Sequence, residues 1–202
     1  WLSDAPNAGC SISISNSILA GRKIFVYAGN MGIAQGVGIL LDLAENLMVR
    51  KDIGFLFVGR GSSAQQLILE SKSRGLDNTL VYSEIDPSEI PGLYEQCHVG
   101  LVVLDPRHKT HNLPGKFLSY IQSGLPVLAS INPNNDLEEL ITSERIGRVC
   151  IKKSVDTMKC LAEDLLKDLS VDVGMRSRCL ELSKRMFSPE IAVNQIVQAL
   201  SQ

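Results

Sequence analysis

Short apolar runs alternate with amphipathic stretches along most of the chain. Six runs have the length and composition of buried strands, at 23–28, 53–58, 79–82, 99–104, 126–130 and 147–150. Between them, apolar residues recur at helical spacing, as at Val37, Leu40 and Leu47 within 34–50. Strands that alternate with helices predict right-handed βαβ units. We therefore expect an α/β fold with a doubly wound, Rossmann-like parallel sheet and helices on both faces.

The two ends of the chain depart from this alternation. Residues 1–22 are small and polar, which is typical of a linker or of the end of a preceding domain, although 11–14 could form a short strand. From residue 155 onward the pattern predicts a helical tail, broken at Met186–Glu190, where Ser188 would cap a final helix. We expect one domain over 23–202. Because the chain begins with Trp1, we interpret it as a piece of a longer protein.

Composition and charge exclude several classes of function. With 202 residues, of which 45% are hydrophobic, the chain can bury a substantial core. A net charge of −2 gives no sign of the basic surface that nucleic-acid binding requires. The five cysteines show no C-x-x-C spacing, which predicts neither a zinc site nor a disulfide framework and favours a reducing compartment. No apolar run approaches the roughly 18 residues of a membrane helix, and no signal peptide is visible.

The loop after the first predicted strand is the first candidate for ligand binding. Doubly wound sheets bind ligands beyond the carboxyl ends of their strands. Glycines at 29, 32 and 36 would let backbone N–H groups and a helix N-terminus approach an anion. The spacing G-x-x-G-x-x-x-G differs from the dinucleotide fingerprint and from the P-loop, which disfavours an NAD domain and a P-loop ATPase. The same glycines also suit a tight turn that holds no ligand.

A second candidate is the loop at 105–116. Pro114 and Gly115 fix a turn, and Lys116 lies in the first turn of the next helix, where a cation is unfavourable unless it also faces a phosphate. An exposed, solvated lysine is the alternative interpretation. His111 alone is more typical of a surface or structural histidine than of a catalyst.

Other polar residues follow neighbouring predicted strands. Arg60 could offer a forked donor to a diphosphate, or could be a surface arginine, and Tyr82 and Ser83 begin the loop at 82–86. The segment 132–136 could bind sugar hydroxyls, although a turn with a helix cap at Asp136 explains it better. No Asp-x-Asp pair occurs in a loop, so the sequence predicts no metal site. We interpret Cys97 and His98 as structural.

Several segments, taken in order, resemble a known family. They are Tyr27–Gly32 with Ala34–Gly36, Phe57–Gly61, Ile90–Tyr94, Pro114–Tyr120 and Ser123–Ala129. Together they resemble the C-terminal domain of family-four retaining glycosyltransferases over about 23–202. The resemblance implies the two-domain GT-B architecture, in which this domain binds a nucleotide sugar and a missing N-terminal domain binds the acceptor. It implies no obligatory metal or other cofactor.

The resemblance also implies a biological setting. The subgroup with Gly-Asn-x-Gly and Ala-Gln-Gly often builds surface polysaccharides, such as O-antigen, from UDP-sugars. Its acceptor is commonly lipid-linked. We therefore expect a cytoplasmic enzyme, peripheral at the inner face of a membrane, of which this piece alone would be inactive.

The residues that the resemblance assigns to the site come from four loops. Donor contacts are expected from Gly29, Asn30, Met31, Gly32, Gln35, Arg60, Tyr82, Ser83, Asn112, Leu113, Pro114, Gly115, Lys116 and Ser119. Two positions that often carry glutamate hold His111 and Ser119, which with Lys116 are the catalytic candidates. Asn30 and Gln35 replace the usual arginine and lysine, and Lys116 and Arg60 would supply the missing charge. A UDP-N-acetylhexosamine 2-epimerase and a non-catalytic binding module remain alternatives.

Overall fold

A six-stranded parallel sheet forms the centre of the molecule. The computed structural model describes residues 9–32, 36–104, 113–152 and 154–187. The strands are β1 (Lys23–Ala28), β2 (Ile53–Val58), β3 (Thr79–Tyr82), β4 (Val99–Val103), β5 (Val127–Ser130) and β6 (Gly147–Cys150), in the order β3-β2-β1-β4-β5-β6. All neighbours are parallel. The predicted doubly wound sheet is thus confirmed, with its switch point between β1 and β4.

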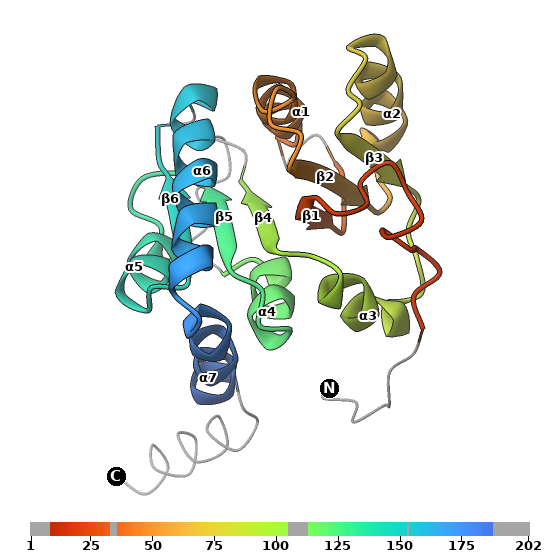
Figure 1. The fold of residues 1–202 in the computed structure, drawn as a ribbon. Helices are drawn as coiled ribbons and strands as arrows, with labels where there is room; N and C mark the ends of the chain where they lie inside the picture. Colours follow the sequence, from red (N-terminus) through yellow and green to blue (C-terminus); the bar gives the residue numbers. More distant parts are fainter. Residues whose placement is uncertain (1–8, 33–35, 105–112, 153, 188–202) are drawn as a thin grey trace, which may run out of the picture.

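Helices cover both faces of this sheet (Figure 1). They are α1 (Gly38–Asn46), α2 (Ala64–Ser73), α3 (Ile90–Glu95), α4 (Gly115–Gln122), α5 (Asp136–Ser143), α6 (Val155–Val171) and α7 (Met175–Phe187), with a 3₁₀ turn, η2, at Pro87–Glu89. Buried residues of α1, α2 and α6 join one hydrophobic cluster, and those of α3, α4 and α5 join the other, as do Cys179 and Leu182 of α7. The helices therefore sort into two layers with the sheet between them.

The two hydrophobic clusters explain why the strands have such continuous apolar sequences. In β1, Ile24 and Val26 pack on the α4 side, whereas Phe25 and Tyr27 pack on the α1 side. Phe25 stacks on Phe55 of β2 with ring centroids 5.4 Å apart. Because both faces of the strand are buried, the sequence shows an unbroken run instead of an alternation.

Several predicted boundaries were wrong. Helix α1 begins at Gly38, not near residue 34, because Val37 occupies the N-cap. The N-cap of α5 is Asn135, whose side chain accepts a hydrogen bond from the Leu137 N–H, so Asp136 is the first helical residue instead of the cap. No strand forms at 11–14, where Ile12 and Ile14 instead join the hydrophobic cluster on the α4 side.

The helical tail also has a break that the apolar pattern did not predict. Helix α6 ends at Val171 and α7 starts at Met175. The Asp172 side chain accepts a hydrogen bond from the Gly174 N–H at 3.1 Å and forms an ion pair with Arg178, which stabilises the turn. The predicted break at Met186–Glu190 extends beyond the described residues, and Ser188 lies outside them.

Candidate functional site

The backbones that follow β1 and β2 remain paired beyond the ends of the strands. The Gly29 N–H donates to the carbonyl of Val58 at 2.9 Å, and the Met31 N–H donates to that of Arg60 at 2.7 Å. The Met31 amide is therefore already used, and its side chain is buried. Within the described part of the chain, the amides of Asn30 and Gly32 make no such bond. They are the two donors that this loop can still offer to an anion.

This close approach of the two loops requires glycine in the second one. Gly59 has a φ of 152°, and a Cβ there would lie 1.9 Å from the Gly29 carbonyl oxygen. Gly61 has a φ of 138°, and a Cβ there would lie 2.6 Å from the Asn30 side-chain oxygen. Any larger residue would push the Gly29 loop away from β2.

Lys116 reaches the end of β1 from helix α4. Its Cε would lie 4.0 Å from a Cβ on Gly29, so the lysine passes directly beside the loop. Its Nζ is buried and has no hydrogen-bond partner among the residues that the structure describes. Burial lowers the pKa of the Lys116 amine from its ordinary value to about 7. Near neutral pH the amine is therefore balanced between its charged and neutral forms.

The aromatic ring of Tyr27 lies directly beneath this amine. The Lys116 Nζ lies 3.6 Å from the ring centroid, in the geometry of a cation–π contact. The Tyr27 hydroxyl donates to the Asn30 carbonyl at 2.7 Å, and burial raises the pKa of the phenol, which keeps it neutral. Tyr27 thus joins Lys116 to the Gly29 loop. Tyr27 was not among the predicted site residues, although an aromatic residue two positions before a glycine turn was a usable signal.

Tyr120 holds helix α4, and with it Lys116, against the sheet. Its hydroxyl accepts a hydrogen bond from the Ala28 N–H at 3.1 Å and lies 3.2 Å from the Val26 carbonyl and 3.3 Å from that of Leu101. Gly100 makes room for the ring, because a Cβ there would lie 2.5 Å from it. Tyr120 therefore bridges β1 and β4 at the switch point of the sheet.

The remaining described residues of the predicted α4 loop lie around this point. Pro114 is the N-cap of α4, and Leu113 packs against the hydrophobic cluster on the α4 side. Gly115 is exposed at the start of the helix. The Ser119 hydroxyl donates to the Gly115 carbonyl at 3.3 Å, one turn earlier. Ser119 is a neutral side chain, and its hydroxyl is already hydrogen-bonded within α4.

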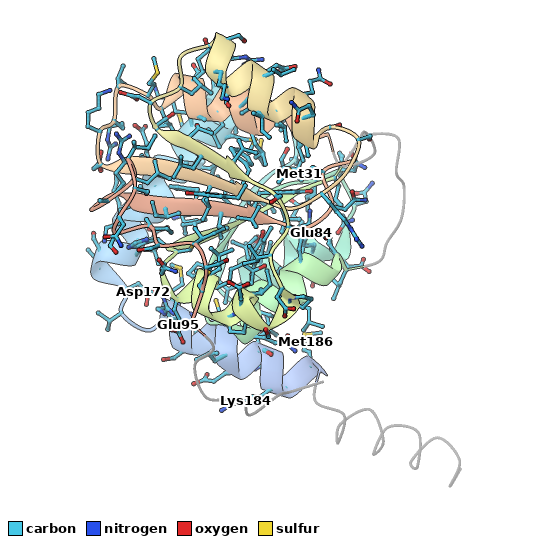
Figure 2. The ribbon with its side chains drawn as sticks, turned by 90° about the vertical axis from the view of Figure 1, so that its right-hand side faces the viewer. Met31, Glu84, Glu95, Asp172, Lys184 and Met186 are labelled. Atoms are coloured by element: carbon cyan, nitrogen blue, oxygen red, sulfur yellow. The ribbon has the colours of Figure 1, made fainter. Side chains whose placement is uncertain are left out.

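Arg60 and Glu84 form an ion pair at the same edge of the sheet. Their Nε and Oε2 atoms are 3.2 Å apart, and the side chains are 79% and 55% exposed. Figure 2 shows Met31 and Glu84 at the same end of the sheet. Tyr82 and Ser83 are exposed at the end of β3. Arg60 is thus exposed to solvent and paired with the carboxylate of Glu84.

The structure brings together part of the predicted set. Gly29, Asn30 and Lys116 meet at the end of β1, with Arg60 on the adjoining strand end. Gln35, His111 and Asn112 lie outside the described residues, so their roles stay predictions. Within the described ranges, no three His, Cys, Asp or Glu side chains are grouped to hold a metal ion. No helix of that part of the chain is long and apolar enough to cross a membrane.

Comparison with solved structures supports the fold. The chain is similar to Anabaena Alr3699/HepE, solved with UDP-glucose, at 16% identity and a TM-score of 0.73 over 90% of this chain and 49% of that one. The catalytic domain of cholesterol-alpha-glucosyltransferase from Helicobacter pylori has 12% identity and a TM-score of 0.67, over 81% of this chain and 98% of that one. The C-terminal domain of LpcC from Francisella tularensis has 18% identity and a TM-score of 0.65, over 84% and 88%.

The match to a sequence family is more specific than these structural similarities. The chain spans about half the length of the HepE chain that it resembles. No curated protein matches it. The family described as "Glycosyl transferases group 1" matches residues 12–185, which is most of the chain. The chain therefore belongs to the group 1 glycosyl transferases.

Proposed function

We propose that this chain is the nucleotide-sugar-binding half of a retaining glycosyltransferase. It would transfer a hexosyl group from a UDP-sugar to a glycan or lipid-linked acceptor, in the synthesis of a surface polysaccharide such as O-antigen. Residues 23–202 would form the donor domain, and residues 1–22 would connect it to an acceptor-binding domain. The whole enzyme would work on the cytoplasmic side, peripheral to the membrane, with neither a cofactor nor a metal.

One observation carries this proposal, namely the buried amine of Lys116, which has no hydrogen-bond partner in the described part of the chain. Burying an amine without a hydrogen bond costs free energy, which a ligand oxygen at the same place would offset. A second buried polar atom without a partner, the Ser130 hydroxyl, lies at the carboxyl end of β5. Both are found at the edge where doubly wound sheets bind their ligands. A diphosphate placed over Gly29 would accept a hydrogen bond from Lys116.

The same arrangement suits the departure of a diphosphate. As the bond between sugar and phosphate breaks, negative charge develops on the leaving oxygen, and fixed donors stabilise it. Lys116 would provide a protonated amine, and the free amides of Asn30 and Gly32 would add neutral donors. Arg60 would exchange Glu84 for a phosphate oxygen. This half of the enzyme then needs no general base, and His111 and Ser119 would contact the transferred sugar.

Calorimetric titration of the chain with UDP, UDP-glucose, GDP and ADP tests the proposal. We expect UDP and UDP-glucose to bind, and we expect Lys116→Met to weaken both by at least about tenfold, the size of one charge-assisted hydrogen bond. Lys51→Met is the matched control, because Lys51 is exposed and pairs with Asp77. Equal affinity of the wild type and Lys116→Met for UDP would refute this role for Lys116.

A non-catalytic binding module is the second candidate. It is favoured by Ser119, whose hydroxyl is bonded to its own helix and which provides no carboxylate. A single-turnover assay of the full-length protein with a radiolabelled UDP-sugar separates the two candidates. Transfer or hydrolysis of the sugar supports the enzyme, whereas tight binding with neither reaction supports the module.

A further inference from the structure

A groove opens at the amino ends of the strands, opposite the edge that holds Lys116. Its volume is about 530 Å³, and its lining includes Lys23, His98, Pro126, Leu166, Leu169 and Arg176. Asp172, which also lines it, lies at the end of the sheet away from Met31 and Glu84 (Figure 2). Pockets for small ligands usually measure about 300–1,000 Å³, so the groove is large enough for one.

The carboxylates that line the groove are all held by arginines. Asp52 and Glu163 both bind Arg50, at 2.9 Å and 3.1 Å. Asp172 forms its ion pair with Arg178, at 2.5 Å. Each carboxylate of the groove therefore has an arginine partner, although Asp52 and Glu163 share Arg50.

Two cations of the groove are not balanced in this way. Neither Lys23 nor Arg176 forms an ion pair with any residue that the structure describes. The guanidinium of Arg176 has a single long hydrogen bond, 3.4 Å from the Ser123 carbonyl. Both cations line the groove together with His98, and burial, with the positive charges of Lys23 and Arg176, lowers the pKa of its imidazole. Two cations without an ion-pair partner therefore line the same groove as His98.

His98 adds a neutral donor between these cations. The Ile24 N–H donates to its Nδ1 at 3.1 Å, which leaves the proton of the neutral ring on Nε2. Three donors of different kinds, an ammonium, a guanidinium and an imidazole N–H, therefore line one groove. Several oxygens on one atom, as in a phosphate, satisfy such a set better than a planar carboxylate does.

The wall beside the donors is apolar and partly open. Pro126, Leu166 and Leu169 line it, together with Val173, which is 92% exposed. An aliphatic group attached to the bound anion would cover these side chains and remove them from water.

We propose that this groove is a second binding site, which takes a phosphate monoester carrying an aliphatic chain. Lys23, Arg176 and the Nε2–H of His98 hold the phosphate, and the aliphatic chain lies along Pro126, Leu166 and Leu169. A soluble alkyl phosphate and the headgroup of an anionic lipid share this chemistry. The site is independent of the donor site proposed above, since it lies at the other edge of the sheet.

Calorimetry with methyl phosphate and octyl phosphate tests the site. Octyl phosphate should bind at least about tenfold more tightly than methyl phosphate, because it buries several methylene groups. The double variant Lys23→Gln/Arg176→Gln should weaken octyl phosphate binding by at least about tenfold. His98→Asn, which keeps an acceptor for the Ile24 N–H but removes the Nε2–H, should weaken it severalfold. Lys51→Gln, a lysine that does not line the groove, should leave it unchanged.

Two further measurements make the result decisive. UDP-glucose affinity, measured on the same variants, should not change, which separates the groove from the carboxyl edge.

Co-sedimentation with phosphatidylcholine vesicles, with and without phosphatidic acid, identifies the source of the phosphate. Vesicle binding that needs Lys23 and Arg176 assigns a lipid, and octyl phosphate binding alone assigns a soluble ester. If the double variant does not fold, His98→Asn provides the same test. Absent binding of octyl phosphate, or equal binding by wild type and folded variants, would overturn the proposal.

Discussion

The two edges of the sheet hold positive charge in opposite ways. At the carboxyl edge, the amine of Lys116 is buried over Tyr27 and makes no hydrogen bond to any described residue, and burial lowers its pKa to about 7. At the amino edge, Lys23 is exposed and Arg176 reaches only one distant carbonyl. A buried cation without a hydrogen bond costs stability, whereas a solvated one does not. The carboxyl edge is therefore the more specialised of the two, and variants at the two edges should behave differently.

The largest difference should come from the close packing of the loops at the carboxyl edge. Gly59→Ala would place a Cβ 1.9 Å from the Gly29 carbonyl at a φ of 152°. We expect a loss of roughly 3–5 kcal/mol of unfolding free energy, from steric overlap and backbone strain. Urea denaturation measures it. Gly115→Ala, at the same edge but with nothing within 4 Å of the added Cβ, is the control and should change stability by less than about 1 kcal/mol.

The next effect is a pH dependence that belongs to the buried amine alone. Folding lowers the pKa of Lys116 to about 7, below its unfolded value, so the unfolded chain binds the extra proton at intermediate pH. Stability should therefore rise with pH above 7 and should lack this contribution at lower pH. Between pH 7.5 and 9, the free energy of unfolding of the wild type should rise by about 1.4 kcal/mol per pH unit relative to that of Lys116→Met. Lys23→Met should keep the pH dependence of the wild type. If Lys116→Met also kept it, the pH dependence would come from a group other than Lys116.

A smaller effect is expected where Tyr120 links the helix of the site to the sheet. Tyr120→Phe removes the acceptor of the buried Ala28 N–H, which should cost about 1–3 kcal/mol. UDP affinity should fall as well, because α4 would position Lys116 less well. Tyr94→Phe is the control: its ring packs 5.1 Å from that of Tyr120, but its hydroxyl has no hydrogen bond within the described residues. Thermal unfolding and UDP titration measure the stability and the UDP affinity of both variants. Equal losses in Tyr120→Phe and Tyr94→Phe would mean that the Tyr120 hydroxyl has no special role.

The smallest effect should come from the exposed ion pair. Glu84→Gln breaks the contact with Arg60, and because both side chains are more than half exposed, we expect less than about 1 kcal/mol in stability. UDP should bind a few times more tightly, since Arg60 no longer has to leave a carboxylate. Unchanged UDP affinity, measured by calorimetry, would mean that Arg60 does not reach the ligand.

The sequence predicted the strands better than it predicted the site. The run Lys23–Ala28 matches β1 because burial on both faces leaves a continuous apolar signal. The contact between Tyr27 and Lys116 joins segments that are distant along the chain, so no local pattern could indicate it. The Met31 amide looked available in the sequence, but pairing with the Arg60 carbonyl uses it. Local chemistry thus indicated which loops matter, and only the packing of the sheet determined which of their groups are free.

The most direct test of the central claim is proton uptake when the donor binds. UDP-glucose should bring negative oxygens to the Lys116 amine and raise its pKa, so binding near pH 8 should take up protons from the buffer. Calorimetry in two buffers of different ionisation enthalpy measures this number. The account predicts a substantial fraction of one proton for the wild type and close to none for Lys116→Met. Equal uptake by the two proteins, or none by the wild type while it binds UDP-glucose, would contradict the account.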